Sequence, residues 1–380
     1  MRRGAAIVTA LNLAASALLA AAGAKADPAA LEPVAFSQIA GWEKDDHSAA
    51  FSVWMKSCGM IDAAAPALRP GVPAGEALAS VCARGMALDP ADERAAKRFF
   101  ETSFQAFRIG RGMLTGYYEP ESFGSLVQTK RFTTPLLGRP ADLVSMMLGE
   151  TLPGIPPNIQ AARRKGQGFE PYPTRSEIED GVLGELARPL VFLDWIDAFF
   201  VHIQGSSRVK LPDGRMIRLA YDGRNGRPFT GIGRLLVEKG EMTKEVATMA
   251  QIRAWLARNP EEGRALMRRN ESYIFFKIDE VLRPEDGPRG AQDVALTPGR
   301  SLAVDRALWP YGLPMWIDGR FPDGARFRRL MIAQDTGSAI KGIARGDYFA
   351  GTGDAAGAVA GGMRQQTDFV VLLPRPEPLR

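Results

Sequence analysis

The sequence predicts a mainly β protein with flanking helices, in which one β domain is inserted into another domain. Helical spacing of apolar residues dominates residues 37–106 and returns after residue 243. Stretches rich in Gly, Pro and β-forming residues occupy residues 112–240 and 291–374. This order of helices, β region, helices, β region is most simply explained by a β domain whose host domain flanks it on both sides.

The composition limits the chemistry that the chain can carry. Its 380 residues are 46% hydrophobic and 24% charged, which is typical of a globular protein with room for two domains. Only two His and two Cys are present, which argues against a multi-ligand zinc site, an iron–sulfur cluster and a scaffold of several disulfides. Lys and Arg are scattered, so no nucleic-acid partner is expected. Any chemistry should therefore rest on carboxylates.

Residues 1–26 are predicted to be a secretory signal peptide. A basic start, Arg2-Arg3, precedes an apolar run to about Ala22, and Ala24-Lys25-Ala26 offers small residues for cleavage. The run ends too early for a stable membrane span, and no Cys follows it to carry a lipoprotein anchor. We therefore expect a periplasmic protein, soluble or peripherally associated with the outer membrane.

The helical stretch assigned to residues 27–111 contains both cysteines, Cys58 and Cys82. In an exported protein, these two cysteines could form one structural disulfide or remain two buried free thiols, and the sequence leaves both alternatives open. Neither belongs to a Cys-x-x-Cys motif, so redox catalysis is not expected.

Local patterns predict individual elements in the middle of the chain. Apolar and polar residues alternate on either side of Pro212-Asp213-Gly214, which predicts a hairpin of a half-buried sheet. Apolar residues three or four apart predict a helix within Thr243–Asn259. His202, between two β-branched residues, is interpreted as a satisfied strand residue rather than a ligand.

The segment 331–351 is the strongest candidate for catalysis. It places Asp335 and Asp347 near glycines in a turn-rich region, and Asp305 lies upstream. Turns bounded by Gly can bring carboxylates from separate loops together. A carboxyl group desolvated beside another carboxylate would have a raised pKa and could act as a general acid. The alternative is that Asp335 and Asp347 only cap turns.

Other patterns suggest different chemistry or a role in ligand binding. Ser338-Ala-Ile-Lys341 matches the Ser-x-x-Lys of penicillin-recognising enzymes, although the companion motifs of those enzymes are missing. The tyrosines Tyr117 and Tyr118 could stack on sugar rings or form partial core. The polar cluster after residue 203 could hydrogen-bond a polar ligand through Gln204, Ser206 and Arg208.

Taken together, these stretches resemble the membrane-bound lytic murein transglycosylase A family. The resemblance covers about residues 100–375 with its motifs in the same order. Besides the three aspartates, the motifs that carry it are Leu114-Thr-Gly-Tyr-Tyr-Glu-Pro, Tyr172-Pro-Thr-Arg-Ser-Glu-Ile, His202-Ile-Gln-Gly-Ser-Ser-Arg, Tyr221-Asp-Gly-Arg-Asn-Gly and Asn270-Glu-Ser-Tyr-Ile-Phe-Phe.

The resemblance implies a fold and an activity. A double-psi β-barrel, residues 291–374, would carry the three aspartates, and a second β-barrel, residues 112–242, would be inserted before it. Residues 243–290 would return to the first domain as helices, and residues 375–380 would be a tail. A groove between the barrels would bind a peptidoglycan glycan strand. The bond between N-acetylmuramic acid and N-acetylglucosamine would be cleaved without water, leaving a 1,6-anhydro end.

The resemblance also implies roles for individual residues. Asp347 would act as acid and then as base, with Asp335 as a supporting carboxylate. Residues expected at the substrate are Asp305, whose role is open, and Tyr117, Tyr118, Gln204, Ser206, Arg208, Tyr221 and Lys341. No metal and no cofactor are required, and recruitment by cell-wall or division machinery is an open expectation. The competing hypothesis is a periplasmic glycan-binding module without catalysis.

Overall fold

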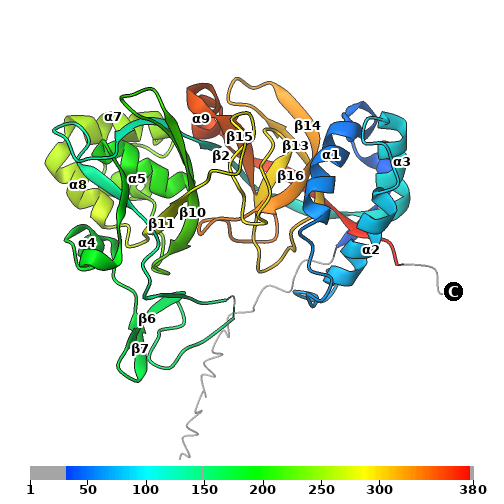
Figure 1. Ribbon diagram of the computed structural model, residues 1–380. Helices are drawn as coiled ribbons and strands as arrows, with labels where there is room; N and C mark the ends of the chain where they lie inside the picture. The colour runs from blue at the N-terminus through cyan, green and yellow to red at the C-terminus, as the bar shows by residue number, and fades with distance from the viewer. Residues whose placement is uncertain (1–30, 148, 377–380) are drawn as a thin grey trace, which may run out of the picture. The chain divides into compact units, whose positions relative to one another are not determined.

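The computed structural model describes residues 31–147 and 149–376 (Figure 1). These residues belong to one compact unit that begins at Leu31. The predicted signal peptide, residues 1–26, and the end of the predicted tail, residues 377–380, lie outside the described residues.

The larger sheet closes on itself. Its strand order is β1-β2-β15-β12-β14-β13-β16, and β2 also pairs with β16, so six strands form a closed barrel to which β1 is added. Closure leaves few unpaired strand edges. The strands are β1 (Glu32–Val34), β2 (Phe104–Glu119), β12 (Ser301–Val304), β13 (Pro314–Arg320), β14 (Arg326–Asp335), β15 (Arg345–Thr352) and β16 (Arg364–Pro374).

Strand β2 closes this barrel because it is long enough to have a different partner on each edge. It pairs antiparallel with β16 from Phe104 to Thr115. Its other edge pairs parallel with β15 from Met113 to Glu119. Apolar side chains of the closed sheet, including Leu114, Leu302 and Phe369, form one buried cluster.

Three helices pack on the outside of the barrel: α1 (His47–Cys58), α2 (Gly75–Gly85) and α3 (Glu93–Ser103). Asp46 and Asp92 cap the starts of α1 and α3 by accepting hydrogen bonds from backbone N–H groups. A buried ion pair, Asp45–Arg300, fastens the segment before α1 to the barrel, with N–O distances of 2.8 and 2.9 Å. Cys58 and Cys82 form a disulfide between α1 and α2, which settles the two alternatives left open by the sequence.

The second sheet has six strands in the order β11-β10-β9-β3-β8-β4. A single bridge between Gly138, next to β4, and Phe276 of β11 brings its two edges together. The predicted hairpin is confirmed, since β9 and β10 pair antiparallel around Pro212-Asp213-Gly214. The strands are β3 (Glu121–Ser125), β4 (Thr134–Leu137), β8 (Pro189–Leu193), β9 (Ser207–Lys210), β10 (Met216–Arg224) and β11 (Ile274–Ile278).

Smaller elements surround the second sheet. Strands β5 (Leu143–Ser145), β6 (Ala161–Lys165) and β7 (Gly168–Pro171) form a separate three-stranded sheet. The helices are α4 (Arg175–Glu179), α5 (Trp195–Gln204), α6 (Ile232–Glu238), α7 (Met249–Arg258) and α8 (Pro260–Arg268), and apolar side chains of α5 to α8 form one buried cluster. Helix α9 (Gly353–Gly362) instead packs on β2 and β15 of the barrel.

The mainly β fold with flanking helices is confirmed, while its double-psi connectivity stays a prediction. His202, however, lies in helix α5 and not in a strand, because Asp194 caps the helix start and Gly205 ends it with a positive φ of 88°. The helix predicted within Thr243–Asn259 is confirmed as α7, which begins at Met249 because the Thr248 hydroxyl caps it there. No helix within the described ranges is long and apolar enough to cross a bilayer.

The disulfide should contribute measurably to stability. Replacing both Cys58 and Cys82 by Ser should lower the free energy of unfolding by about 3 kcal/mol, because the unfolded chain loses the loop constraint. Urea unfolding followed by tryptophan fluorescence measures this difference. A reductant should destabilise the wild-type protein to the same level and leave the double variant unchanged. Equal stability of both proteins without reductant would show that the bond contributes nothing.

Candidate active site

Four neighbouring strands of the barrel place the two candidate catalytic aspartates in one row. Asp347 of β15 lies opposite Thr115 of β2 on one side and opposite Ala303 of β12 on the other. Ala303 in turn lies opposite Asp335 of β14. Residues directly opposite each other in a sheet have side chains on the same face. The barrel therefore brings the two aspartates together, as the sequence predicted from their turn-rich segment.

Asp347 accepts a short hydrogen bond from the Thr115 hydroxyl through Oδ1. The same Thr115 oxygen accepts a hydrogen bond from the Arg345 guanidinium at 2.7 Å. Asp347 is only half-buried, so part of its surface stays accessible. A reacting group can therefore approach a carboxyl that its neighbours hold in place.

Asp335 is held more firmly than Asp347. Its Oδ2 accepts a hydrogen bond of 2.8 Å from the Tyr117 hydroxyl. Its Oδ1 accepts hydrogen bonds from the backbone N–H groups of Ala291 (2.9 Å) and Thr336 (2.8 Å). Three donors leave little freedom for this side chain, and all three stabilise its charged form.

The two carboxyl groups differ in how strongly they retain a proton. Burial raises the pKa of Asp347 to about 6, with a further rise from the nearby Asp335 charge, against the opposing effects of Arg345 and Thr115. Burial also raises the pKa of Asp335, but its three hydrogen-bond donors lower it again. Of the two, Asp347 is therefore the better proton donor near neutral pH.

Asp305 organises the loop rather than joining this row. Its carboxylate accepts hydrogen bonds from the backbone N–H groups of Ala307 and Gly342, at 3.1 and 2.9 Å. The Lys341 ammonium forms an ion pair with Asp305 at 3.5 Å. Lys341 is thus paired with a carboxylate, whereas Ser338 is exposed and accepts a hydrogen bond from Arg224. This arrangement gives no support to a Ser–Lys nucleophile.

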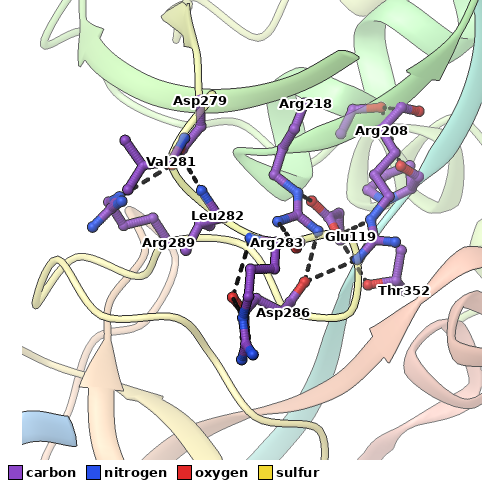
Figure 2. A network of polar contacts seen from close by, with 12 residues as sticks. Glu119, Arg208, Arg218, Asp279, Val281, Leu282, Arg283, Asp286, Arg289 and Thr352 are labelled. Carbon is purple, nitrogen blue, oxygen red and sulfur yellow. Dashed lines mark hydrogen bonds and ion pairs between the residues drawn. The ribbon is translucent and has the colours of Figure 1, made fainter. Parts of the chain in front are cut away.

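A fully buried carboxylate, Glu119, ends strand β2 and joins it to the second sheet (Figure 2). Arg208 of β9 and Arg218 of β10 approach it through their Nε atoms, at 2.9 and 3.1 Å. The Thr352 hydroxyl of β15 donates a hydrogen bond of 2.9 Å to the same carboxylate. Both arginines also donate to the backbone carbonyl of Asp286. Arg208, predicted to bind substrate, is therefore part of a buried structural network.

The remaining predicted substrate residues lie at different places. Gln204, at the end of α5, accepts a hydrogen bond of 3.1 Å from the backbone N–H of Tyr118. The Tyr118 side chain lies next to Gly357 of α9, where an added Cβ would come within 2.8 Å of its ring. Ser206 is buried, whereas Tyr221 of β10 keeps 48% of its surface exposed. Gln204 and Tyr118 are half-buried, so Tyr221 is the most accessible of these four residues.

A cavity of about 470 Å³ lies elsewhere, beside α4, α5 and α8. Arg175, His202 and Tyr273 contribute to its wall, and neither Asp335 nor Asp347 does. The carboxylates, and not this cavity, therefore define the candidate active site. Within the ranges that the structure describes, no group of three His, Cys, Asp or Glu side chains is arranged to hold a metal ion.

Sequence reasoning missed two side chains of β2: Thr115, which contacts Asp347, and Glu119, which joins the strand to the second sheet. Both lie in the motif that begins at Leu114, and both lie an even number of residues from Tyr117. Residues two apart on a strand share a face. This spacing was the available signal, but without the register of β15 it could not show that the face meets Asp347 and Thr352.

Comparisons with known proteins find matches over most of the chain. Residues 113–277 match the family model described as MltA specific insert domain, and residues 300–373 match the 3D domain. The structure resembles a membrane-bound lytic murein transglycosylase from Agrobacterium tumefaciens, with 35% identity, a TM-score of 0.82 and coverage of 91% of this chain and 98% of that one. MltA from Neisseria gonorrhoeae is similar at 31% identity and TM-score 0.73, covering 92% and 93%.

A curated relative, membrane-bound lytic murein transglycosylase A of Escherichia coli K12, is 34% identical over 198 residues. That match covers 50% of this chain and 53% of the relative. In sequence, the chain thus spans about half the length of the curated relatives that it matches.

The buried network around Glu119 should be costly to break. In Glu119→Gln, two guanidinium groups lose their carboxylate in a buried place, so the free energy of unfolding should fall by about 3 kcal/mol. Chemical denaturation measures this loss. The matched control is Asp213→Asn, which removes the exposed partner of Arg215 and should leave the unfolding midpoint unchanged. Equal effects of the two substitutions would contradict a structural role for Glu119.

Proposed function

The chain belongs to the membrane-bound lytic murein transglycosylase A family, and from this premise we propose that it is a peptidoglycan lytic transglycosylase. It cleaves the β-1,4 bond between N-acetylmuramic acid and N-acetylglucosamine without water and leaves 1,6-anhydro ends. Its partner is the glycan strand, and its place of action is the cell envelope, in the periplasm. The names of its relatives and the geometry of Asp347 support this proposal.

The observation that carries the proposal is a carboxyl group suited to give up and take back one proton. With a pKa of about 6, a substantial fraction of Asp347 is protonated at mildly acidic to neutral pH. The Thr115 hydroxyl fixes the orientation of Oδ1. A single such group is enough for a reaction in which the substrate supplies its own nucleophile.

The reaction balances without water. Protonated Asp347 donates its proton to the glycosidic oxygen while the bond from that oxygen to C1 of the muramic residue breaks. The acetamido group of the same residue stabilises the positive charge that develops at C1. The Asp347 carboxylate then takes the proton of the C6 hydroxyl as that oxygen bonds to C1. The enzyme returns to its starting state, protonated at Asp347.

Asp335 supports this cycle through its charge. Its three hydrogen-bond donors favour its negatively charged form next to Asp347, against the opposite effect of burial. That charge helps Asp347 to keep its proton before the reaction and stabilises the developing positive charge at C1. Tyr118 and Tyr221 are proposed to stack on sugar rings. Gln204 is proposed to position the Tyr118 backbone at the substrate, and Ser206 to lie beside it. Asp305 and Lys341 would shape the loop that borders the glycan.

Loss of the Asp347 carboxyl should stop the reaction while the fold survives. Asp347→Ala should lower the turnover of purified peptidoglycan by about a thousandfold or more, since proton transfer fails in both steps. Mass spectrometry of the products should show muropeptides lighter than hydrolysis products by one water with the wild type, and none with the variant. The matched control, Asp368→Ala at an exposed position of β16, should behave as wild type.

Three outcomes would contradict the proposal. Near-wild-type cleavage by Asp347→Ala would remove the acid from the mechanism. Products that include the water would indicate a hydrolase. Intact glycan that still binds the wild-type protein would favour the binding module without catalysis.

A further inference from the structure

The cavity of about 470 Å³ beside α4, α5 and α8 is lined by neither catalytic aspartate. Its size lies within the range of small-molecule sites. Three of the sequence motifs, those that begin at residues 172, 202 and 270, meet at its wall through Arg175, His202 and Tyr273. The exposed fractions of these side chains are between 2% and 8%. The cavity is thus built with buried polar groups that the carboxylate site does not use.

His202 offers a hydrogen-bond donor to this cavity. Its Nδ1 accepts a hydrogen bond of 3.3 Å from the backbone N–H of Ile274. Burial and the charge of Arg175 hold the pKa of the imidazole well below its usual value, so the ring is neutral. A neutral imidazole that accepts at one nitrogen carries its proton on the other. The proton is therefore on Nε2, which makes no hydrogen bond with any residue that the structure describes.

Tyr273 offers a second donor next to the first. Its ring centroid lies 4.2 Å from that of His202, and the Arg175 guanidinium lies over the same tyrosine ring, 5.2 Å from its centroid. The Tyr273 hydroxyl makes no hydrogen bond within residues 31–147 and 149–376. Burial raises the pKa of this hydroxyl, so it keeps its proton. Both donors are therefore available to an acceptor atom of a molecule in the cavity.

The charged side chains of the wall are mostly cationic. They are three arginines and one carboxylate: Arg175, Arg264, Arg268 and Glu179. Glu179 pairs with Arg175 at 3.3 Å. Arg268 pairs with Asp180. Arg264 has no carboxylate partner in the part of the chain that the structure describes, so it leaves one positive charge for an anionic ligand to balance.

Much of the remaining wall is apolar and aromatic. Arg264 lies over the Trp195 ring of α5, 4.5 Å from its centroid. Phe199, one turn further along α5, lies against the Arg175 guanidinium at 5.1 Å. Further apolar side chains in the wall are Leu137, Ile178, Leu183 and Met267. Such a surface suits the apolar body of a ligand, while the donors and the cation suit a charged end.

We propose that this cavity binds a small organic carboxylate whose apolar body packs against Trp195 and Phe199. The Tyr273 hydroxyl and the His202 Nε2–H donate to the carboxylate, and the charge of Arg264 balances it. The site goes beyond the proposed function and is independent of it, since it uses no catalytic aspartate. Two sources have this chemistry: a free organic acid, and the carboxyl end of a peptide whose last residue is apolar.

The informative substitutions remove groups that the fold does not use. Tyr273→Phe removes one hydroxyl and keeps the buried ring. Arg264→Gln removes one exposed charge. Arg175 is less informative, because it donates to two backbone carbonyls at 3.0 and 2.6 Å and so holds the fold. The matched control is Arg94→Gln, at an exposed position of α3.

Isothermal titration calorimetry of the full chain tests the site with two acids and their amides. The probes are 3-phenylpropionate and N-acetyl-leucyl-phenylalanine, each beside the amide that lacks its charge. At least one acid should bind, and its amide should bind about tenfold more weakly. Tyr273→Phe and Arg264→Gln should each weaken binding of that acid by about tenfold, and Arg94→Gln should change nothing.

The pattern of binding decides the matter. Binding of 3-phenylpropionate alone identifies a free acid as the ligand, binding of the peptide alone identifies a carboxyl end, and binding of both supports the shared chemistry. Equal binding of acids and amides overturns the site. So does the absence of binding by either acid, or binding that neither Tyr273→Phe nor Arg264→Gln weakens. Cleavage of peptidoglycan is measured separately, so failure of this site leaves the proposed function untouched.

Discussion

The alternation of side chains along β2 positions the rest of the site. Thr115, Tyr117 and Glu119 are each two residues apart, so they lie on one face of the strand. The first holds Asp347, the second holds Asp335, and the third joins the strand to two arginines of the second sheet. A shift of β2 by one residue against β15 would turn all three side chains away at once. The register of this strand pair is therefore the constraint that the carboxylates and the second sheet share.

Asp335 and Asp347 are the same kind of side chain, but the strand pairing gives them different hydrogen-bond partners and so different acid–base properties. Both side chains are half-buried, but Asp335 receives three hydrogen bonds, whereas Asp347 receives one from Thr115. Both carboxyl groups have a raised pKa because of burial, but the donors around Asp335 oppose this effect more strongly. One aspartate is thus suited to carry a charge and the other to carry a proton, which is the division of roles that a single acid–base residue needs.

Much of this could be predicted from sequence, since the features concerned are local or belong to motifs. The mainly β fold and the hairpin around Pro212-Asp213-Gly214 followed from residues close together in the chain, whereas the roles of Asp335 and Asp347 are implied by the family resemblance and stay predictions. The α5 helix was missed because β-branched residues beside His202 favoured a strand, while the caps at Asp194 and Gly205 decide the outcome. Thr115, Glu119 and the disulfide depend on which distant strands and helices meet.

The central claim is that Asp347 holds the catalytic proton, and its titration tests this most directly. Carbon-13 NMR of the aspartate carboxyl groups, with signals assigned by comparison with Asp347→Asn and Asp335→Asn, measures each midpoint. The account predicts that the Asp347 signal titrates at about pH 6, above that of Asp335. An Asp347 midpoint near the ordinary value of 3.8, or an Asp335 midpoint above that of Asp347, would contradict the assignment of the proton.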